Sequence, residues 1–270
     1  MPVALTIAGS DSGGGAGIQA DLKTFAALGV HGASAITCLT AQNPKRVLAI
    51  EPVSPKMLRQ QLEAVFEELN PRAIKTGMLF SAENILVVTN FFRNPKSEIR
   101  NPKLVVDPIL VSTSGTKLLE PKALKILKDK LLPLATLVAP NLNEASVLID
   151  ENKPISDREE MNRAAREIHR RYGCAVLIKG GHLARSFAAV DIFFDGKIEI
   201  ELGALRINGV RTHGTGCTYS AAICAALALG KNLPQAVQIG KKFVTAAIAR
   251  SYKIGNHFAL NQNKFCGSEF

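Results

Sequence analysis

Short runs of apolar, largely β-branched residues alternate along the chain with segments whose apolar positions recur every three or four residues. The apolar runs are typical of buried strands and occupy residues 3–8, 33–39, 73–75, 104–106, 136–139 and 175–178. The periodic segments predict helices at about 18–28, 58–69, 83–92, 121–132, 161–172 and 214–229, and a last long helix that begins near Pro234. Because strand and helix alternate throughout, the pattern predicts a mostly parallel central sheet with helices on both faces.

The same pattern predicts the domain organisation. No linker or low-complexity segment divides the 270 residues, so we expect a single three-layer α/β domain over residues 1–270, with a poorly defined tail from about residue 255. One hairpin should depart from the parallel order, because residues 190–194 and 197–202 have the pattern of strands that turn at Asp195-Gly196.

Composition narrows the class of protein. Hydrophobic residues make up 47% and charged residues 21% of the chain, as in an ordinary globular protein. Trp is absent and aromatic residues reach only 6%, which argues against a stacking surface for single-stranded nucleic acid. The five cysteines lack C-x-x-C spacing and predict neither a zinc site nor a disulfide framework. We find no signal-peptide pattern, and the longest apolar stretch is too short to cross a bilayer, so we expect a cytoplasmic location and no membrane partner.

The chain is basic, with 33 Lys and Arg against 23 Asp and Glu and a formal net charge of +10. Such a surplus suits nucleic acid, an anionic membrane or a phosphorylated small molecule. Arg163, Arg166 and Arg170 would line one face of a helix, but no aromatic residues are interleaved with them, and we interpret this stripe as a solvated outer face. The diffuse charge favours an anionic substrate, or a role in solubility, over a dedicated nucleic-acid-binding groove.

Polar residues that could carry chemistry follow several of the predicted strands: Asp11, Asp107, Asn141, Glu144 and Lys179. Ligands of open α/β sheets bind at the carboxyl ends of the strands, so these residues can converge on one cleft. Asp107 and Glu144 offer the hard oxygen donors that Mg²⁺ uses, although either could equally cap a helix. Lys179 could reach phosphate groups, or it could be a surface lysine that precedes a loop.

Two glycine-rich turns are candidate anion sites. Residues 13–17 (Gly-Gly-Gly-Ala-Gly) could cradle a phosphate, but they lack the Lys-Ser/Thr of a Walker motif, and a structural tight turn is an equal alternative. Residues 214–217 (Gly-Thr-Gly-Cys) open a helix, where outward-facing amides and the helix dipole favour an anion. Cys217 would stand in the first helical turn, so we predict a stabilised thiolate with a lowered pKa. The alternative is a structural helix cap with a small buried cysteine.

Motifs along most of the chain, taken together, resemble one known family. They occupy residues 4–11, 13–23, 40–43, 75–78, 106–108, 140–145, 179–182 and 213–218, in the family's order. In these motifs the chain is similar to hydroxymethylpyrimidine/phosphomethylpyrimidine kinase of thiamine biosynthesis. The resemblance implies a ribokinase-like fold, a homodimer, and ATP- and Mg²⁺-dependent phosphorylation of 4-amino-5-hydroxymethyl-2-methylpyrimidine to its monophosphate and then to its diphosphate. The chain departs from the pattern at residues 112–115 (Ser-Thr-Ser-Gly), which lack the Lys that often precedes Ser-Gly.

The resemblance also implies roles for individual residues. The pyrimidine pocket would be lined by Gly9, Asp21, Gln42, Met78 and Ile109. ATP would be held by Lys179, Thr215 and Asn141, and Mg²⁺ would be organised by Asp107 and Glu144. The anion hole would be the turn of Gly214 and Gly216. Cys217 would act as the base of the first phosphorylation, at a position where many ribokinase-like enzymes have Asp.

Two other functions stay open at this point. A pyridoxal-type kinase would use the same scaffold, but Gln42 favours an aminopyrimidine, because its amide can donate and accept at once. A non-catalytic anion- or nucleic-acid-binding protein would exploit the net charge of +10, but it would not need the predicted catalytic and metal-binding residues together. The presence or absence of ATP turnover distinguishes these classes.

Overall fold

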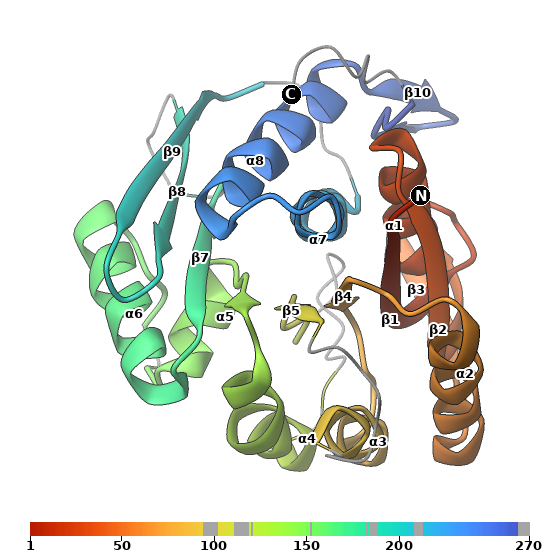
Figure 1. Cartoon of the computed structure of the whole chain (residues 1–270). Helices are drawn as coiled ribbons and strands as arrows, with labels where there is room; N and C mark the ends of the chain where they lie inside the picture. The colour runs from red at the N-terminus through yellow and green to blue at the C-terminus, as the bar shows by residue number, and fades with distance from the viewer. Residues whose placement is uncertain are drawn as a thin grey trace.

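One sheet runs through the middle of the molecule (Figure 1). The computed structural model describes residues 1–93, 102–110, 119, 121–151, 153–181, 183, 188–207 and 213–263. Within these ranges nine strands form the sheet in the order β3-β2-β1-β4-β5-β6-β7-β8-β9. Their bounds are β1 Val3–Asp11, β2 His31–Asn43, β3 Arg46–Pro52, β4 Ala73–Thr76, β5 Lys103–Val106, β6 Leu137–Val138, β7 Ala175–Gly180, β8 Ala188–Phe194 and β9 Glu199–Leu205. From β2 to β7 the neighbours run parallel, whereas β3, β8 and β9 pair antiparallel, which confirms the predicted sheet and its hairpin.

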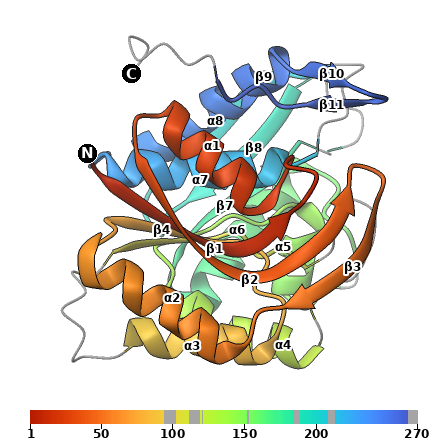
Figure 2. The same cartoon turned by 90° about the vertical axis from the view of Figure 1, so that its right-hand side faces the viewer.

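Helices cover both faces of the sheet, which confirms the predicted three-layer arrangement (Figures 1 and 2). One face carries α1 (Gly17–Ala27), α7 (Thr215–Ala228) and α8 (Leu233–Ala249). The other face carries α2 (Pro55–Glu68), α3 (Ala82–Arg93), α4 (Pro121–Ile126), α5 (Leu142–Leu148) and α6 (Arg158–Tyr172). Among the described residues, no helix combines the length and the apolar character that a bilayer crossing requires.

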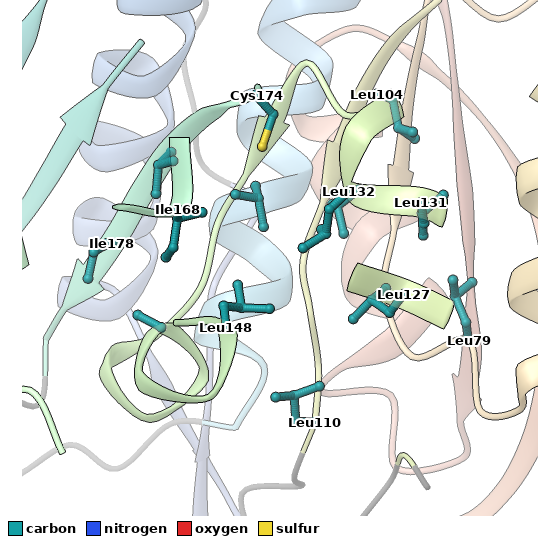
Figure 3. Close-up of a cluster of buried hydrophobic side chains, with 14 of the residues drawn as sticks. Leu79, Leu104, Leu110, Leu127, Leu131, Leu132, Leu148, Ile168, Cys174 and Ile178 are labelled. Atoms are coloured by element: carbon teal, nitrogen blue, oxygen red, sulfur yellow. The ribbon is translucent and has the colours of Figure 1, made fainter. Parts of the chain in front are cut away.

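Two aliphatic cores hold the layers together. The larger core lies between the sheet and helices α2 to α6, and Figure 3 shows its part around Leu131 and Ile168. The other core lies around α7, in which every residue from Cys217 to Ala228 is buried. A helix that is apolar all round is typical of a protein interior, and the many small side chains of α7 let it approach the sheet closely. The N-terminus of α7 is thereby held near the carboxyl ends of the strands.

The helix expected at residues 121–132 is only partly α-helical. The α4 segment ends at Ile126 and is followed by a π-helical turn over Leu127–Leu131 and a 3₁₀ turn over Leu132–Leu134. Pro133 lies in the 3₁₀ turn and has no N–H with which to continue the helical hydrogen bonds, so the helical segment ends with this turn. The sequence pattern also does not predict β3 or the short helix α5.

The described part of the C-terminal segment contains a short hairpin. Residues expected to be poorly defined from about 255 take part in a hairpin of β10 (Tyr252–Ile254) and β11 (His257–Ala259). Beyond the hairpin, the side-chain amide of Gln262 donates a hydrogen bond to Thr218 Oγ1 of α7 at 3.2 Å. The segment therefore packs against the helix that carries the predicted anion hole.

The basic stripe on α6 is a solvated face, as interpreted from the sequence. Arg163 forms an ion pair with Glu151, and Arg166 forms one with Glu199. The two arginine side chains are 52% and 60% exposed. Their positive charge is balanced by acidic neighbours, so this face is suited to solvent rather than to a phosphate backbone.

Candidate active site

Two of the predicted strand-end residues meet in an ion pair. Asp107 directly follows β5, Lys179 lies near the end of β7, and Lys179 Nζ is 2.8 Å from Asp107 Oδ1. Ser220 of α7 donates a hydrogen bond to the other carboxylate oxygen at 2.8 Å. Burial alone would raise the pKa of Asp107, but the ammonium groups of Lys179 and Lys75 outweigh it and hold that pKa below its ordinary value. An ionised carboxylate and a charged lysine therefore stand side by side at the carboxyl edge of the sheet.

Asn141 and Glu144 form the N-terminal cap of α5. The Asn141 side chain accepts a hydrogen bond from the Glu144 amide at 2.9 Å, and Glu144 Oε2 accepts one from the Asn141 amide at 2.8 Å. Glu144 thus takes part in a helix cap, which was the alternative to a metal-binding role. It also shares the electrostatic environment of the ion pair, because burial raises the pKa of its carboxyl to about 7 while the charge of Lys179 opposes that rise. The cap fixes the direction of a carboxylate that lies close to Lys179.

The first turn of α7 faces this ion pair. A Cβ placed on Gly216 would lie 3.3 Å from Lys179 Nζ and 3.8 Å from Asp107 Oδ2, so glycine leaves this space open. Gly214, the N-cap, has a φ of 85°, and a Cβ at this position would collide with the carbonyl oxygen of Gly15. The two glycine-rich turns therefore touch backbone to backbone. This contact holds the backbone amides of the helix N-terminus close to Lys179 and Asp107.

Replacement of Gly214 tests this contact. Gly214→Ala puts a side chain on a left-handed residue, which costs about 1–3 kcal/mol in strain before the collision with Gly15 is counted. We expect kcat to fall at least about tenfold, because the displaced turn no longer lies beside Lys179 and Asp107. We expect the melting temperature to fall as well. Gly203→Ala on β9 is the matched control, since nothing lies within 4 Å of its added Cβ. Kinetics and thermal unfolding that do not differ between the two variants would contradict the contact.

The structure corrects the prediction for the Cys217 thiol. The side chain packs against Ala16, Ala20 and Ile109, and only 7% of the residue is exposed. Burial raises the pKa of the thiol to about 11, and the nearby positive charge of Lys75 only partly offsets this rise. The predicted lowering of the pKa is therefore wrong for this structure, because the loss of water outweighs the stabilising effect of the helix N-terminus.

Asp21 of α1 lies in a fully buried ion pair. Lys75 Nζ of β4 is 2.8 Å from Asp21 Oδ2 and 3.0 Å from Oδ1, and the Thr6 hydroxyl donates to Oδ2 at 2.6 Å. Neither charged side chain has any exposed surface. The pair acts electrostatically on Cys217, with Lys75 favouring the thiolate and Asp21 opposing it. Asp21 thus supports the site from the interior, and its contact with a pyrimidine stays a prediction.

Gly9, Met78 and Ile109, all predicted pocket residues, lie along one apolar wall. A Cβ on Gly9 would lie 2.7 Å from Met78 Cε, and a Cβ on Gly77 would lie 3.6 Å from Ile109 Cδ1. Ile109 in turn packs against Cys217. The absence of side chains at the two glycines lets the wall approach the ends of β1 and β4. The structure thus brings predicted pocket residues next to the predicted base.

Gln42 contacts a histidine to which the sequence assigns no separate role. Gln42 Nε2 lies 2.9 Å from His213 Nε2, and the same ring nitrogen lies 3.3 Å from Asp11 Oδ2. The Gln42 NH2 group donates to the tautomer that carries its proton on Nδ1, whereas the tautomer with its proton on Nε2 donates to Asp11 instead. Asp11 also accepts hydrogen bonds from amides of the turn at residues 13–17, at 2.8–3.1 Å. The amides of that turn are therefore used by the Asp11 carboxylate, which favours a structural tight turn over a phosphate-binding loop. The signal for His213 in the sequence is its place directly before Gly214.

Comparison with known proteins decides the family. The chain matches the family described as phosphomethylpyrimidine kinase over residues 11–261. The chain belongs to the phosphomethylpyrimidine kinase family. The hydroxymethylpyrimidine/phosphomethylpyrimidine kinase of Rhizobium meliloti (strain 1021) is 48% identical to it over 252 residues, which cover 93% of this chain and 92% of the relative. Among solved structures, phosphomethylpyrimidine kinase from Clostridium difficile 630 shares 43% identity with a TM-score of 0.79, over 92% of this chain and 100% of that one. The Bacillus subtilis pyridoxal kinase, solved as an ADP complex, shares 35% identity with a TM-score of 0.87, over 97% of each chain.

Membership of the phosphomethylpyrimidine kinase family confirms the resemblance carried by the motifs, and both solved structures confirm the α/β kinase fold. Because one of these structures is a pyridoxal kinase, the fold alone does not choose the acceptor, and the choice depends on the pocket. Two predicted motif segments, residues 112–115 and His182, lie outside the described residues. In the ranges that are described, no three His, Cys, Asp or Glu side chains gather into a metal cluster.

Proposed function

We propose that this chain phosphorylates 4-amino-5-hydroxymethyl-2-methylpyrimidine to its monophosphate and then phosphorylates the monophosphate to the diphosphate, with ATP as the donor. The two steps would provide the pyrimidine half of thiamine diphosphate. The observation that carries the proposal is the meeting of two half-sites at the start of α7. Gly216 faces the Lys179–Asp107 pair, and the adjacent Cys217 packs on Ile109 at the apolar wall. A phosphate donor on one side and a hydroxymethyl acceptor on the other would meet at this turn.

The side with the ion pair would take the nucleotide. The ATP phosphates would be held by Lys179, Thr215 and Asn141. Asp107 and Glu144 would hold Mg²⁺, and the residues fit this ion, because Mg²⁺ commonly binds one or two carboxylates and completes its coordination with phosphate oxygens and water. When bound, the ion neutralises negative charge on the phosphates. Ser220 and the cap of α5 already orient the two carboxylates for this role.

The first turn of α7 would support the transfer itself. Its backbone amides and the helix dipole would stabilise negative charge on the phosphoryl group as it moves. As a thiolate, Cys217 Sγ would take the proton from the hydroxymethyl oxygen in the first phosphorylation and become a thiol, and the charge of Lys75 favours that thiolate. The second phosphorylation needs no such base, because a phosphate monoester has a second pKa of about 6 and is largely ionised at neutral pH.

Gln42 and Met78 would recognise the aminopyrimidine. A glutamine amide presents a donor and an acceptor side by side, which matches the amino group and ring nitrogen of the substrate. Met78 supplies a polarizable apolar contact to a flat ring, and the missing side chain of Gly9 leaves room for Met78 Cε to pack beside it. The hydroxypyridine of pyridoxal lacks the amino donor and would lose part of this pairing. The pocket therefore favours the pyrimidine over the pyridoxal alternative.

A homodimer is part of the proposal, as the resemblance implies. The hairpin of β2 and β3 at one edge of the sheet leaves Leu39 and Leu48 51% and 61% exposed. Apolar side chains at an exposed sheet edge are suited to a partner surface. Light scattering on the preparation used for the assay below should give twice the mass of one chain, and the mass of a single chain would contradict the dimer.

ATP consumption by the purified chain with Mg²⁺ tests the proposed reaction, with hydroxymethylpyrimidine, its monophosphate and pyridoxal offered separately. We expect turnover on both pyrimidines, a kcat/KM for pyridoxal at least about tenfold lower, and loss of all turnover in EDTA. Activity on pyridoxal alone would assign the pyridoxal-kinase alternative. Turnover on the monophosphate alone would remove the first step from the proposal. ATP binding without turnover on any acceptor would assign the non-catalytic alternative.

A further inference from the structure

The side chain of His213 joins two groups that lie far apart along the chain. Its Nε2 is 2.9 Å from Gln42 Nε2 at the end of β2 and 3.3 Å from Asp11 Oδ2 at the end of β1. His213 itself directly precedes Gly214, the N-cap of α7. The imidazole is only 17% exposed. One ring therefore touches the predicted pyrimidine-binding amide, a fixed carboxylate and the start of the anion hole.

The surroundings of the ring are rigid on two sides. Asp11 is held by hydrogen bonds from the turn at residues 13–17. A Cβ on Gly15 would lie only 3.2 Å from His213 Cδ2, so the backbone of this turn also packs against the ring itself. On the other side of His213, Gly214 rests on the Gly15 carbonyl. The imidazole thus has little freedom to move relative to α7.

Gln42 differs, because its backbone is fixed by hydrogen bonds but its long side chain can rotate about several bonds. Ser12 Oγ donates to the backbone carbonyl oxygen of Gln42 at 2.9 Å and accepts from the backbone N–H of Gln42 at 2.8 Å. The strand pairing between β2 and β3 shifts register between Ala41 and Gln42, and Gln42 stays paired with Val47 of β3. Only the contact with His213 restrains the end of the side chain among the hydrogen bonds described for Gln42. Ordering such a side chain on binding costs affinity, and a residue that orders it beforehand saves that cost.

We propose that His213 is a positioning residue, which holds the Gln42 amide ready for the aminopyrimidine edge and ties that amide to the first turn of α7. This inference rests on the proposed function, where Gln42 recognises the substrate. The imidazole acts through Gln42 and exchanges no proton with the substrate. Its removal should therefore weaken the binding of the hydroxymethylpyrimidine and of its monophosphate alike, whereas removal of a base would slow one step without weakening binding.

Three variants test this role in the full-length chain. His213→Ala should raise KM about tenfold for both pyrimidines and leave KM for ATP unchanged, with kcat within about threefold of the wild type. His213→Gln keeps an amide that can bond to Gln42 and Asp11 but cannot exchange protons at neutral pH, so it should restore KM to within about threefold. His31→Ala, at the exposed start of β2, is the matched control and should change nothing. Thermal unfolding of each variant shows whether the fold is retained.

Coupling between the Gln42 and His213 substitutions in substrate affinity distinguishes a positioning role from a merely structural one. Calorimetry with hydroxymethylpyrimidine alone should show that Gln42→Ala weakens binding and that adding His213→Ala to it weakens binding no further, since the histidine acts through the glutamine. Additive losses would overturn the inference. The inference would also be overturned if His213→Gln had a normal KM but a kcat as low as that of His213→Ala. The imidazole would then act as an acid or base rather than as a positioning group. Unchanged binding in Gln42→Ala would instead refute the pyrimidine site of the proposed function, and the positioning role with it.

Discussion

Cys217→Ala should slow the phosphorylation of hydroxymethylpyrimidine by at least about 100-fold, while the phosphorylation of its monophosphate falls by less than about tenfold. The difference arises because the hydroxymethyl group must lose a proton, whereas the phosphate of the monophosphate is already ionised. Rapid-quench measurement of each step with its own purified acceptor separates the two effects. The thiol packs against Ile109 of the apolar wall and lies one residue after Gly216 of the predicted anion hole, where the proposed role requires a base.

Cys224→Ala is the matched control for this substitution. Cys224 lies on the same helix and is also buried, but it packs in the core around α7 rather than against the predicted pocket. Its replacement removes the same sulfur atom and should leave both steps within about threefold of the wild type. Equal losses in the two steps for Cys217→Ala would reject Cys217 as the base of the first step.

The pH dependence of the first step follows from the burial of Cys217. With a pKa of about 11 the group is a thiol at neutral pH, and the thiolate fraction of the free enzyme rises about tenfold per pH unit between about pH 7 and 9. Since kcat/KM reports groups of the free enzyme, we expect it to rise with that slope for hydroxymethylpyrimidine and to be shallow for the monophosphate. The slope should disappear in Cys217→Ala. A wild-type profile that is flat over this range would contradict proton transfer to Sγ.

Those parts of the fold and site that depend on neighbours in sequence can be predicted. Apolar runs at residues 104–106 and 175–178 suffice to place Asp107 and Lys179 at one edge of the sheet, because parallel strands share their carboxyl ends. The 2.8 Å ion pair confirms that placement. The features that the sequence pattern does not predict also have physical reasons. Helix α5 has only 7 residues, too few to display two turns of periodicity, so the cap at Glu144 is visible only as an alternative.

Features that depend on partners far along the chain cannot be predicted in this way. Lys75 and Asp21 are 54 positions apart, and Gln42 and His213 are 171 positions apart, so no local pattern links either pair. The error about the pKa of Cys217 has the same origin. The rule for helix termini applies to a thiol that water or a cation can reach, but two alanines at the start of α1 cover this one. Burial is a property of the packed molecule and was not contained in the glycine-rich motif.

Lys75→Met should lower the free energy of unfolding by about 3–5 kcal/mol, because it leaves the Asp21 carboxylate buried without a partner. Methionine has nearly the volume of lysine, so little packing is lost. Lys75→Met combined with Asp21→Leu removes both charges and should recover most of the loss, since apolar replacement of a whole buried pair is often neutral. Urea denaturation measures both variants. Arg59→Met is the matched control, because Arg59 and Glu63 pair on the surface with 65% and 51% exposure, and it should cost less than about 1 kcal/mol.

The loss in Lys75→Met should also grow with pH. Burial raises the pKa of Asp21 above its ordinary value even with the attraction of Lys75, and the variant lacks that attraction. The folded variant then keeps its carboxyl proton after the unfolded chain has released it at about pH 4. Because the folded state binds more protons over that interval, its stability falls as the pH rises toward the folded-state pKa. Relative to the wild type, the variant should thus lose more stability at pH 8 than at pH 5. Two results together would contradict the unpaired charge as the cause. One is a loss of stability that is equal at pH 5 and pH 8, and the other is a double variant as unstable as Lys75→Met alone. They would show that packing around Lys75 stabilises this part of the site.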